Sequence, residues 1–281
     1  MDVQWYPGHM TKARRQMEED IRLVDLVIEL VDARTPVSSR NPDIRTIRGN
    51  KPEVLILNKA DLADPERTKK FEELFLSEGI PAVAMDSRDP AAAKRVKATI
   101  REAAAEKIAR DRKRGIVGRP VRVMIAGIPN VGKSTLINTL AGRGAAKTGN
   151  KPGVTKGRQW IALSRELQLL DTPGILWPKF DDQEIGRRLA VTGTINDTIL
   201  DTEELSLYLI SYLRREYPGL LEERYRFEVL PEKKDAEVLS LIGESQRILA
   251  KGGEPDLERT AKRVIDDFRA GRIGRCTLEA I

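Results

Sequence analysis

A glycine-rich motif in this 281-residue chain has the residue types and spacing that bind the phosphates of a nucleotide. Gly127, Gly132, Lys133 and Ser134 match the pattern Gly-x-x-x-x-Gly-Lys-Ser, between a strand pattern at 121–126 and a helical pattern. In such a loop backbone N–H groups hold the phosphates, Lys133 reaches the β- and γ-phosphates, and the Ser134 hydroxyl binds Mg²⁺. We expect further nucleotide contacts from the remaining residues of this stretch, Asn130, Val131, Gly132 and Thr135.

A second motif, Asn58-Lys59-Ala60-Asp61, distinguishes guanine from adenine. The Asp61 carboxylate can accept hydrogen bonds from guanine N1–H and N2–H₂, which adenine lacks. Asn58 can hold the loop and the far edge of the base, and the Lys59 stem can lie along the ring. A site built around these donors rejects adenine, because the polar groups of the site would be left unpaired when adenine is bound. The motif therefore favours GTP over the alternative of an ATP-dependent phosphoryl transferase, and nucleotide competition would decide between them.

Three further segments supply candidate ligands. Asp171 and Gly174, in Asp-Thr-Pro-Gly, match the segment that holds Mg²⁺ through water and meets the γ-phosphate with a backbone amide. Thr155, in Lys-Pro-Gly-Val-Thr, is the candidate Mg²⁺ ligand of the first switch; the alternative is a Pro-Gly turn with an incidental threonine. Asp86 and Ser87 follow a third strand pattern and would form a second loop against the base.

Strand patterns precede these loops. Short apolar runs at Leu26–Val31, Val54–Leu57 and Ala82–Met85 alternate with helical patterns, which indicates parallel strands. The run at 121–126 continues the pattern, and 159–174 predicts a hairpin. Because loops at the carboxyl ends of parallel strands meet at one crevice, we expect all five motifs to surround one nucleotide.

The order of the motifs is unusual, because the base loops precede the phosphate loop. Moving the chain ends leaves such a site intact if the old ends are bridged and the new ones lie at the surface. Residues 89–120 favour helix and then become basic, and we interpret them as the connector that joins two ends of one sheet. The sequence thus predicts an α/β fold with a circularly permuted P-loop GTPase domain at 1–178, a mostly parallel sheet with helices on both faces.

Residues 179–281 predict a small all-helical C-terminal domain. Asp201 would cap a first helix, with Glu204 placed for a capping box. A second helix fits Asp235–Leu249, ended by the glycines at 252 and 253, and a third fits Asp256–Arg269. The third helix presents one apolar face, formed by Leu257, Ala261, Val264, Ile265 and Phe268.

Composition narrows the class of protein. Lys and Arg (49) outnumber Asp and Glu (43), which favours an anionic partner. Cys276 is the single cysteine, which excludes an intrachain disulfide and a cysteine zinc site. The N-terminus lacks the apolar core of a signal peptide, and the most apolar run is broken by Asp25 and Glu29. We expect a cytoplasmic monomer with no membrane partner.

Basic residues gather in three groups that predict contact with RNA, although a solvated helix face explains the last group nearly as well. We expect recognition of backbone and shape, with binding that weakens as salt rises. The groups are Lys12, Arg14 and Arg15; residues 110–119; and Arg259, Lys262, Arg263, Arg269, Arg272 and Arg275.

Over nearly its whole length the sequence resembles the ribosome biogenesis GTPase A (YlqF) family of permuted GTPases. The motifs that carry the resemblance are WYPGHMTKARRQ, DARTPVSSRNP, NKAD, GIPNVGKSTLIN, KPGVT, LLDTPGILWPKF and RRLAVTG. The resemblance implies a GTP-dependent factor that acts late in assembly of the large (50S) ribosomal subunit and contacts ribosomal RNA through its helical tail. We expect a Mg²⁺-dependent GTPase with slow basal turnover that the ribosomal particle raises. The alternative is a GTP-regulated RNA-binding protein whose hydrolysis is incidental.

Activation of the attacking water is open between two candidates, because Ile175 stands where Ras-like enzymes place a water-orienting glutamine. His9, the single histidine, could position the water; alternatively it contacts RNA or packs on the sheet. Asn130 resembles the asparagine of GTPases in which K⁺ bridges the phosphates; alternatively it bonds within its own loop. K⁺ would offset charge that develops in the transition state.

Overall fold

The computed structural model describes residues 8–142, 159–171, 182–195, 201–228 and 232–281. The chain forms two compact units, one of Met1–Asp181 with Glu279–Ile281 and one of Asp182–Leu278. Within the described residues no helix has the length and apolar character needed to cross a membrane.

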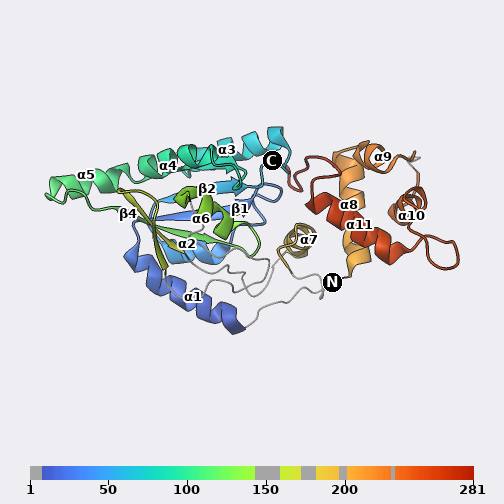
Figure 1. The fold of residues 1–281 in the computed structure, drawn as a ribbon, viewed down its shortest axis with the longest axis horizontal. Helices are drawn as coiled ribbons and strands as arrows, with labels where there is room; N and C mark the ends of the chain where they lie inside the picture. The colour runs from blue at the N-terminus through green and yellow to red at the C-terminus, as the bar shows by residue number, and fades with distance from the viewer. Residues whose placement is uncertain (1–7, 143–158, 172–181, 196–200, 229–231) are drawn as a thin grey trace. The chain divides into compact units, whose positions relative to one another are not determined.

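A six-stranded sheet forms the centre of the first unit, in the order β3-β2-β1-β4-β6-β5. All neighbouring pairs are parallel except the β5–β6 hairpin, which confirms the predicted α/β class. In Figure 1 the blue strand β1 lies between β2 and the green strand β4, although β2, β3 and the helices between them intervene in sequence between β1 and β4. The strands are β1 Leu26–Asp32, β2 Glu53–Asn58, β3 Ala82–Met85, β4 Val121–Gly127, β5 Gln159–Ala162 and β6 Leu167–Asp171.

Helices cover both faces of this sheet. Val27 packs in one cluster with Met17 of α1 and Ile44 of α2, while Val31 packs with Phe71 of α3. Val27 and Val31 lie on the same face of β1 because alternate side chains of a strand point the same way. The opposite-facing residues of β1 are equally buried, and α4 and α6 contact each other and the strands β2, β3 and β4. The helices are α1 Gly8–Asp20, η1 Ile21–Leu23, α2 Pro42–Arg48, α3 Pro65–Ser77, α4 Ala92–Ala103, α5 Ala105–Lys113 and α6 Lys133–Ala141.

The connector differs from its expected path. Residues 89–120 contain α4 and α5, and they lead from the edge strand β3 to β4. β4 lies inside the sheet, between β1 and β6, so the connector does not join the two ends of the sheet. The reason is that β4 carries the phosphate loop, and a central strand places that loop among the other strand ends.

The loop that follows β1 is held by buried carboxylates. Glu29, in the middle of β1, accepts hydrogen bonds from Arg40 Nε (3.0 Å) and from the backbone N–H of Asn41 (2.8 Å). Burial raises the pKa of Glu29 to about 7, although the charge of Arg40 opposes this and that of Glu53 adds to it. These bonds fix the end of the loop against the strand from which it starts.

The last residues of the chain also hold this loop. Glu279 is buried, and its two carboxylate oxygens accept hydrogen bonds from the backbone N–H groups of Val37 (2.6 Å) and Ser38 (2.7 Å). Arg67 of α3 donates to the Glu279 carbonyl at 3.2 Å. Residues 279–281 therefore belong to the first unit, whereas the sequence analysis assigned 179–281 to the helical domain.

The second unit is helical. Its core is formed by side chains such as Leu209, Val238, Val264 and Phe268, which are buried within it. Asp201 accepts hydrogen bonds from the N–H groups of Glu203 (2.9 Å) and Glu204 (3.1 Å), which confirms it as a helix cap. The helices are α7 Gln183–Val191, α8 Thr202–Glu216, α9 Leu220–Tyr225, α10 Asp235–Ser245 and α11 Leu257–Arg269.

Helix α10 ends at Ser245, four residues before the predicted end at Leu249. Arg247 adopts a left-handed conformation (φ 53°), and the N–H of Ile248 donates to Gly243 O at 2.8 Å. This is the usual hydrogen-bond pattern of a helix that ends in a left-handed residue. The prediction was wrong because that position usually holds glycine, and here it holds arginine.

Candidate nucleotide site

The glycine-rich loop connects β4 to the first turn of α6, and two of its glycines are required by close backbone packing. A Cβ at Gly127 would lie 2.5 Å from the carbonyl oxygen of Leu30. A Cβ at Gly132 would lie 2.4 Å from Asn58 Nδ2, and the positive φ of 103° at Gly132 also disfavours other residues. Both contacts are with strands or loops that lie far from this loop in the sequence.

Lys133 lies at the start of α6 and points back over its own loop. Its Nζ donates to the carbonyl oxygens of Gly127 (3.1 Å) and Ile128 (2.9 Å), and the residue is only 9% exposed. Ser134 and Thr135 follow in the first turn of α6 and are half-buried. Here backbone N–H groups at the helix N-terminus and the lysine ammonium combine to favour an anion. Asn130 is exposed on the loop, in a left-handed conformation (φ 58°).

Asn58 forms hydrogen bonds with three other loops. Its Nδ2 donates to the carbonyl oxygen of Val131, at 2.7 Å and 73 residues away in the chain. Its Oδ1 accepts from the backbone N–H of Ser87 at 2.8 Å, and its own carbonyl accepts from Ala33 N at 2.8 Å. The structure therefore brings the base motif, the second base loop and the phosphate loop into direct contact, in spite of their reversed order in the sequence.

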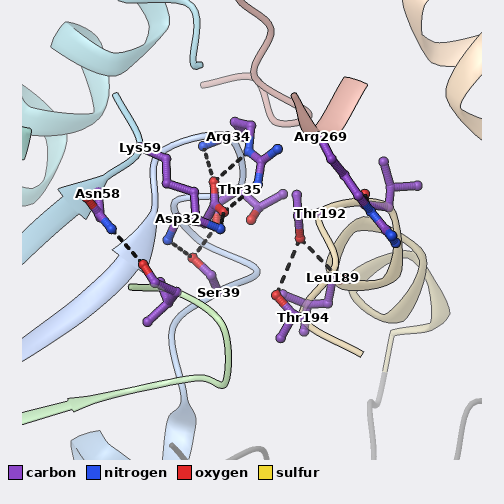
Figure 2. A network of polar contacts seen from close by, with 12 residues as sticks. Asp32, Arg34, Thr35, Ser39, Asn58, Lys59, Leu189, Thr192, Thr194 and Arg269 are labelled. Atoms are coloured by element: carbon purple, nitrogen blue, oxygen red, sulfur yellow. Dashed lines mark hydrogen bonds and ion pairs between the residues drawn. The ribbon is translucent and has the colours of Figure 1, made fainter. Parts of the chain in front are cut away.

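Lys59 is held by a buried acidic residue that the sequence analysis did not select. Lys59 Nζ donates to Asp32 Oδ2 at 2.9 Å, and Arg34 donates to both carboxylate oxygens of Asp32 (Figure 2). Burial alone would raise the pKa of Asp32, but the charges and hydrogen bonds of Arg34 and Lys59 hold it well below its ordinary value. Asp32 is therefore ionised throughout the physiological range.

Asp61 and Asp86, one from each base loop, share a partner. Arg88 Nη2 donates to Asp61 Oδ2 at 2.6 Å and to Asp86 Oδ2 at 2.8 Å. Hydrogen bonding by Arg88 lowers the pKa of Asp86, against the opposing effect of burial. Thr139 of α6 donates to the carbonyl oxygen of Ser87 at 2.6 Å, which fixes the second base loop to the helix of the phosphate loop.

The switch residues lie largely outside the described part of the chain. Thr155, Gly174 and Ile175 fall in the ranges that are not described. Asp171 ends β6 and is in register with Ile125 of β4, so its backbone lies beside the strand that carries the phosphate loop. His9 lies in α1, and the side chains of Asp171 and His9 are not among those described.

A hydroxyl and a carboxylate are the hard oxygen ligands that Mg²⁺ prefers. Ser134 begins α6 directly after β4, and β6, which ends in Asp171, is the parallel neighbour of β4. This donor set and its strand placement fit a magnesium ion at the phosphate end of the site.

Asp32, Arg34 and Arg88 are the polar residues at this edge that sequence analysis missed. A signal for Asp32 was available, because it ends a buried strand just as Asn58 ends the next one, and the two residues are direct partners in the parallel register. Arg34 lies with Asp32 in the segment DARTPVSSRNP, which was used only for the family resemblance, and Arg88 carried no comparable signal, since an arginine in a loop is usually solvated.

Comparison with known proteins gives full-length matches. The family model described as 50S ribosome-binding GTPase matches residues 122–241, a span that begins in β4 and leaves out the base motif. The chain is 45% identical to ribosome biogenesis GTPase A of Bacillus pumilus over 279 residues, covering 99% of each chain. It is 31% identical to ribosome biogenesis GTPase A of Thermotoga maritima, covering 99% of this chain and 94% of that protein.

Solved structures match as well. A GDP-bound structure of TM YlqF has a TM-score of 0.69 and 26% identity, covering 94% of this chain and 98% of that one. A GNP-bound YlqF from T. maritima has a TM-score of 0.65 and 27% identity, covering 95% of this chain and 97% of that one.

Proposed function

This chain belongs to the ribosome biogenesis GTPase A family, and from that premise we propose that it acts in assembly of the large ribosomal subunit and that the particle stimulates its GTP hydrolysis. That it is a GTPase of ribosome biogenesis follows from the family itself. The finer steps, which concern the subunit, the stimulation and the roles of single residues, are the proposal.

One observation carries the proposed site: the Asn58 side chain bonds both the phosphate loop and the second base loop. A nucleotide has a base at one end and phosphates at the other, so its two recognition motifs must be close and fixed relative to each other. In this proposal Asp61 accepts from guanine, the Lys59 stem lies along the ring, and Ser87 approaches the base edge. The phosphates lie on the loop backbone, from Asn130 to Thr135, with Lys133 at their β and γ positions.

Mg²⁺, which GTPases generally use, would be held by Ser134, Thr155 and Asp171 and would neutralise charge on the β- and γ-phosphates. The Gly174 amide would meet the γ-phosphate. The chain's own contribution is to orient the phosphates: Lys133, now bonded to loop carbonyls, exchanges those partners for phosphate oxygens. The exchange keeps its ammonium paired in both states.

Two residues, Asn130 and His9, are candidates for activating the water that attacks the γ-phosphate. Asn130 is exposed on the loop, where a K⁺ ion could bridge it and the phosphates. His9 would orient the water directly. Identical GTP turnover in NaCl and KCl would remove the potassium step, and full particle-stimulated turnover by His9→Ala would remove His9.

RNA contact is proposed for the second unit, at three arginines that share one carboxylate. Asp267 is fully buried and accepts from Arg224 Nη2 (2.7 Å), Arg263 Nε (3.2 Å) and Arg272 Nε (2.6 Å). One carboxylate neutralises only one of the three charges. The side chains of Arg263 and Arg272 are 46% and 50% exposed, so they present fixed guanidinium groups to solvent. Such groups suit RNA phosphates.

A matched pair of double variants tests this contact. Arg263→Gln with Arg272→Gln should weaken binding to large-subunit particles and lower the slope of log affinity against log salt by about 2, one for each phosphate contact. Arg259→Gln with Lys262→Gln removes the same amount of charge from α11, at positions that do not bind Asp267, and should have a much smaller effect. Equal effects of the two pairs would point to general electrostatic attraction instead.

The experiment that tests the proposed function measures GTP turnover with no particle, with large-subunit particles and with small-subunit particles, each in KCl and in NaCl. We expect slow turnover alone, a rise with large-subunit particles only, and a higher rate in KCl. Lys133→Ala is the control for contaminating activity. Equal rates with the two kinds of particle would overturn the subunit assignment, and no rise with either would overturn stimulation.

A further inference from the structure

Asp32 lies outside all of the nucleotide-binding motifs but contacts one of them through its side chain. We propose that Asp32 is a positioning residue for guanine recognition, which holds the Lys59 ammonium so that the Lys59 stem is fixed against the base. The proposal rests on the nucleotide site proposed above and adds to it the residue pair, Asp32 and Arg34, that orders the base-contacting lysine.

The position of Asp32 follows from the sheet. It is the last residue of β1 and pairs in register with Asn58, the last residue of β2, so it lies beside the residue that precedes Lys59. Its carboxylate is buried, at 1% exposure. The backbone N–H of Asp32 donates to Ser39 Oγ at 2.9 Å, and Ser39 in turn donates to Thr35 O at 2.6 Å. The backbone at Asp32 is thus fixed independently of its carboxylate.

Arg34 fixes the carboxylate itself. Oδ1 accepts from the Arg34 backbone N–H (3.0 Å) and from Arg34 Nε (2.9 Å), while Oδ2 accepts from Arg34 Nη2 (2.8 Å). A two-point arginine pair sets both the position and the plane of a carboxylate. Oδ2 then accepts Lys59 Nζ at 2.9 Å, as Figure 2 shows. The direction of the lysine ammonium is therefore determined by a group that cannot itself rotate.

Lys59 also has an unusual backbone. Its φ is +59°, a conformation that a residue with a long side chain seldom adopts, and such strained positions gather at functional sites. Hydrogen bonds hold the backbone on both sides: Ala33 N donates to Asn58 O at 2.8 Å, and Leu62 N donates to Lys59 O at 2.9 Å. With its backbone and its ammonium both fixed, the lysine stem is ordered before a base arrives.

The consequence is a gain in affinity through pre-organisation. A lysine that is free in the unliganded protein must be immobilised on binding, which weakens affinity by about ten-fold or somewhat less. Because the stem contacts the base and not the phosphates, the effect should be the same for GDP and for GTP. Loss of the contact between Asp32 and Lys59 should therefore raise KM and leave kcat at saturating GTP unchanged.

The test is a double-mutant cycle between Asp32→Asn and Lys59→Met, read by titration with fluorescent N-methylanthraniloyl-GDP. Asp32→Asn keeps the shape and an acceptor for Arg34 but loses the charge that attracts Lys59. We expect Asp32→Asn to weaken GDP binding by about 3- to 10-fold in the wild-type background and to have no further effect in the Lys59→Met background. Ser39→Ala is the matched control, because it removes a contact of the Asp32 backbone and leaves the carboxylate and Lys59 paired; its GDP affinity should stay within two-fold of wild type by the same estimate.

Two results would overturn the inference: an equal loss of affinity on Asp32→Asn in both backgrounds, or a loss on Ser39→Ala as large as that on Asp32→Asn.

Chemical labelling of wild-type lysines by acetic anhydride adds a measurement that needs no variant to fold. Lys59, whose side chain is 25% exposed, should react more slowly than Lys69 at 78%, by more than the roughly three-fold ratio of exposures. Labelling at the ratio of exposures or faster would contradict the ion pair. Wild-type protein that fails to bind GDP would refute the proposed site itself, whereas normal binding with no coupling would refute only the role of Asp32.

Discussion

Replacing Asn58 by aspartate should separate the phosphate loop from the base loops in a manner that depends on pH. Asn58 is 1% exposed and donates to Val131 O at 2.7 Å while accepting from Ser87 N at 2.8 Å. Asn58→Asp keeps the acceptor but places a carboxylate oxygen where the donor was, facing a carbonyl oxygen. Asn58→Ala removes both hydrogen bonds and serves as the reference.

The magnitudes follow from the number of groups left unpaired. Asn58→Ala leaves the buried carbonyl of Val131 and the buried N–H of Ser87 without a hydrogen-bond partner. Each costs ~1–3 kcal/mol, so the free energy of unfolding should fall by ~2–6 kcal/mol. Asn58→Asp leaves only the carbonyl of Val131 without a hydrogen-bond partner, at ~1–3 kcal/mol, and adds the repulsion between that carbonyl oxygen and the carboxylate oxygen facing it. Burial and the facing carbonyl raise the pKa of the introduced carboxyl above its ordinary value.

The pH dependence has a definite sign. Once protonated, the introduced carboxyl can donate its O–H to Val131 O and restore the missing hydrogen bond. A group whose folded-state pKa is raised contributes stability that is present below its unfolded pKa, ~3.9 for aspartate, and is lost as the pH rises through the folded value. The difference in stability between wild type and Asn58→Asp should therefore widen from pH 5 to pH 8, by at most ~1.4 kcal/mol per pH unit.

Urea unfolding followed by tryptophan fluorescence measures this effect in the right part of the chain. Of the three tryptophans, Trp160 lies in β5, within the described part of the first unit, and it is the reporter of that unit. Curves for the wild type and both variants at pH 5 and pH 8 give the differences, and Asn58→Ala should show no widening. A wild-type-minus-Asn58→Asp difference that is the same at both pH values would refute the assignment of Asn58 as donor to the phosphate loop.

Three further predictions use the same reporter or a GDP titration. The folded-state pKa of Glu29, about 7, exceeds its ordinary 4.5, so the stability that it contributes is present below pH 4.5 and is lost as the pH rises to about 7. Glu29→Gln should flatten the stability curve in that window, and an unchanged slope would contradict the raised pKa. Arg88 and guanine offer similar N–H donors to Asp61, so Arg88→Ala should strengthen GDP binding by about 2- to 5-fold, the range of an exposed ion pair; weaker binding would mean that Arg88 supports the base loop instead. Glu279→Gln makes both backbone N–H groups lose a charged acceptor and leaves one of them facing an amide NH₂, so it should destabilise the first unit by ~1–2 kcal/mol, whereas a change below 0.5 kcal/mol, the usual range for surface substitutions, would show that the tail adds little.

Sequence patterns predicted the sheet well because buried parallel strands leave a strong signal. The apolar runs at β1, β2 and β3 lie within one residue of the observed strands, since strands packed under helices are mostly apolar along their length. The helix cap at Asp201 was also predicted, because a cap depends on a single side chain and its local backbone.

The features that sequence analysis missed depend on an unusual backbone conformation or on distant partners. The early end of α10 at Arg247 uses a conformation that the residue type does not favour, so local propensity pointed elsewhere. The return of Glu279 to the first unit depends on two backbone N–H groups more than two hundred residues away. The sequence marks Asp32 only as the last residue of a strand, because the lysine that its carboxylate binds, Lys59, lies in the loop after the neighbouring strand β2.

Convergence of the motifs follows from register rather than from order along the chain. Asp32 pairs with Asn58, and Asn58 pairs with Met85, so three strands end at one level. Gly127 pairs with Leu30, which brings the phosphate loop to the same edge. Register alone places the loops side by side, but it does not fix the distance between them. That distance depends on side chains that cross from loop to loop, as Asn58 does to Val131. A permuted chain can therefore keep its site wherever its ends lie, provided that these few crossing hydrogen bonds remain, and this is why a single buried amide is the most sensitive place to test the site.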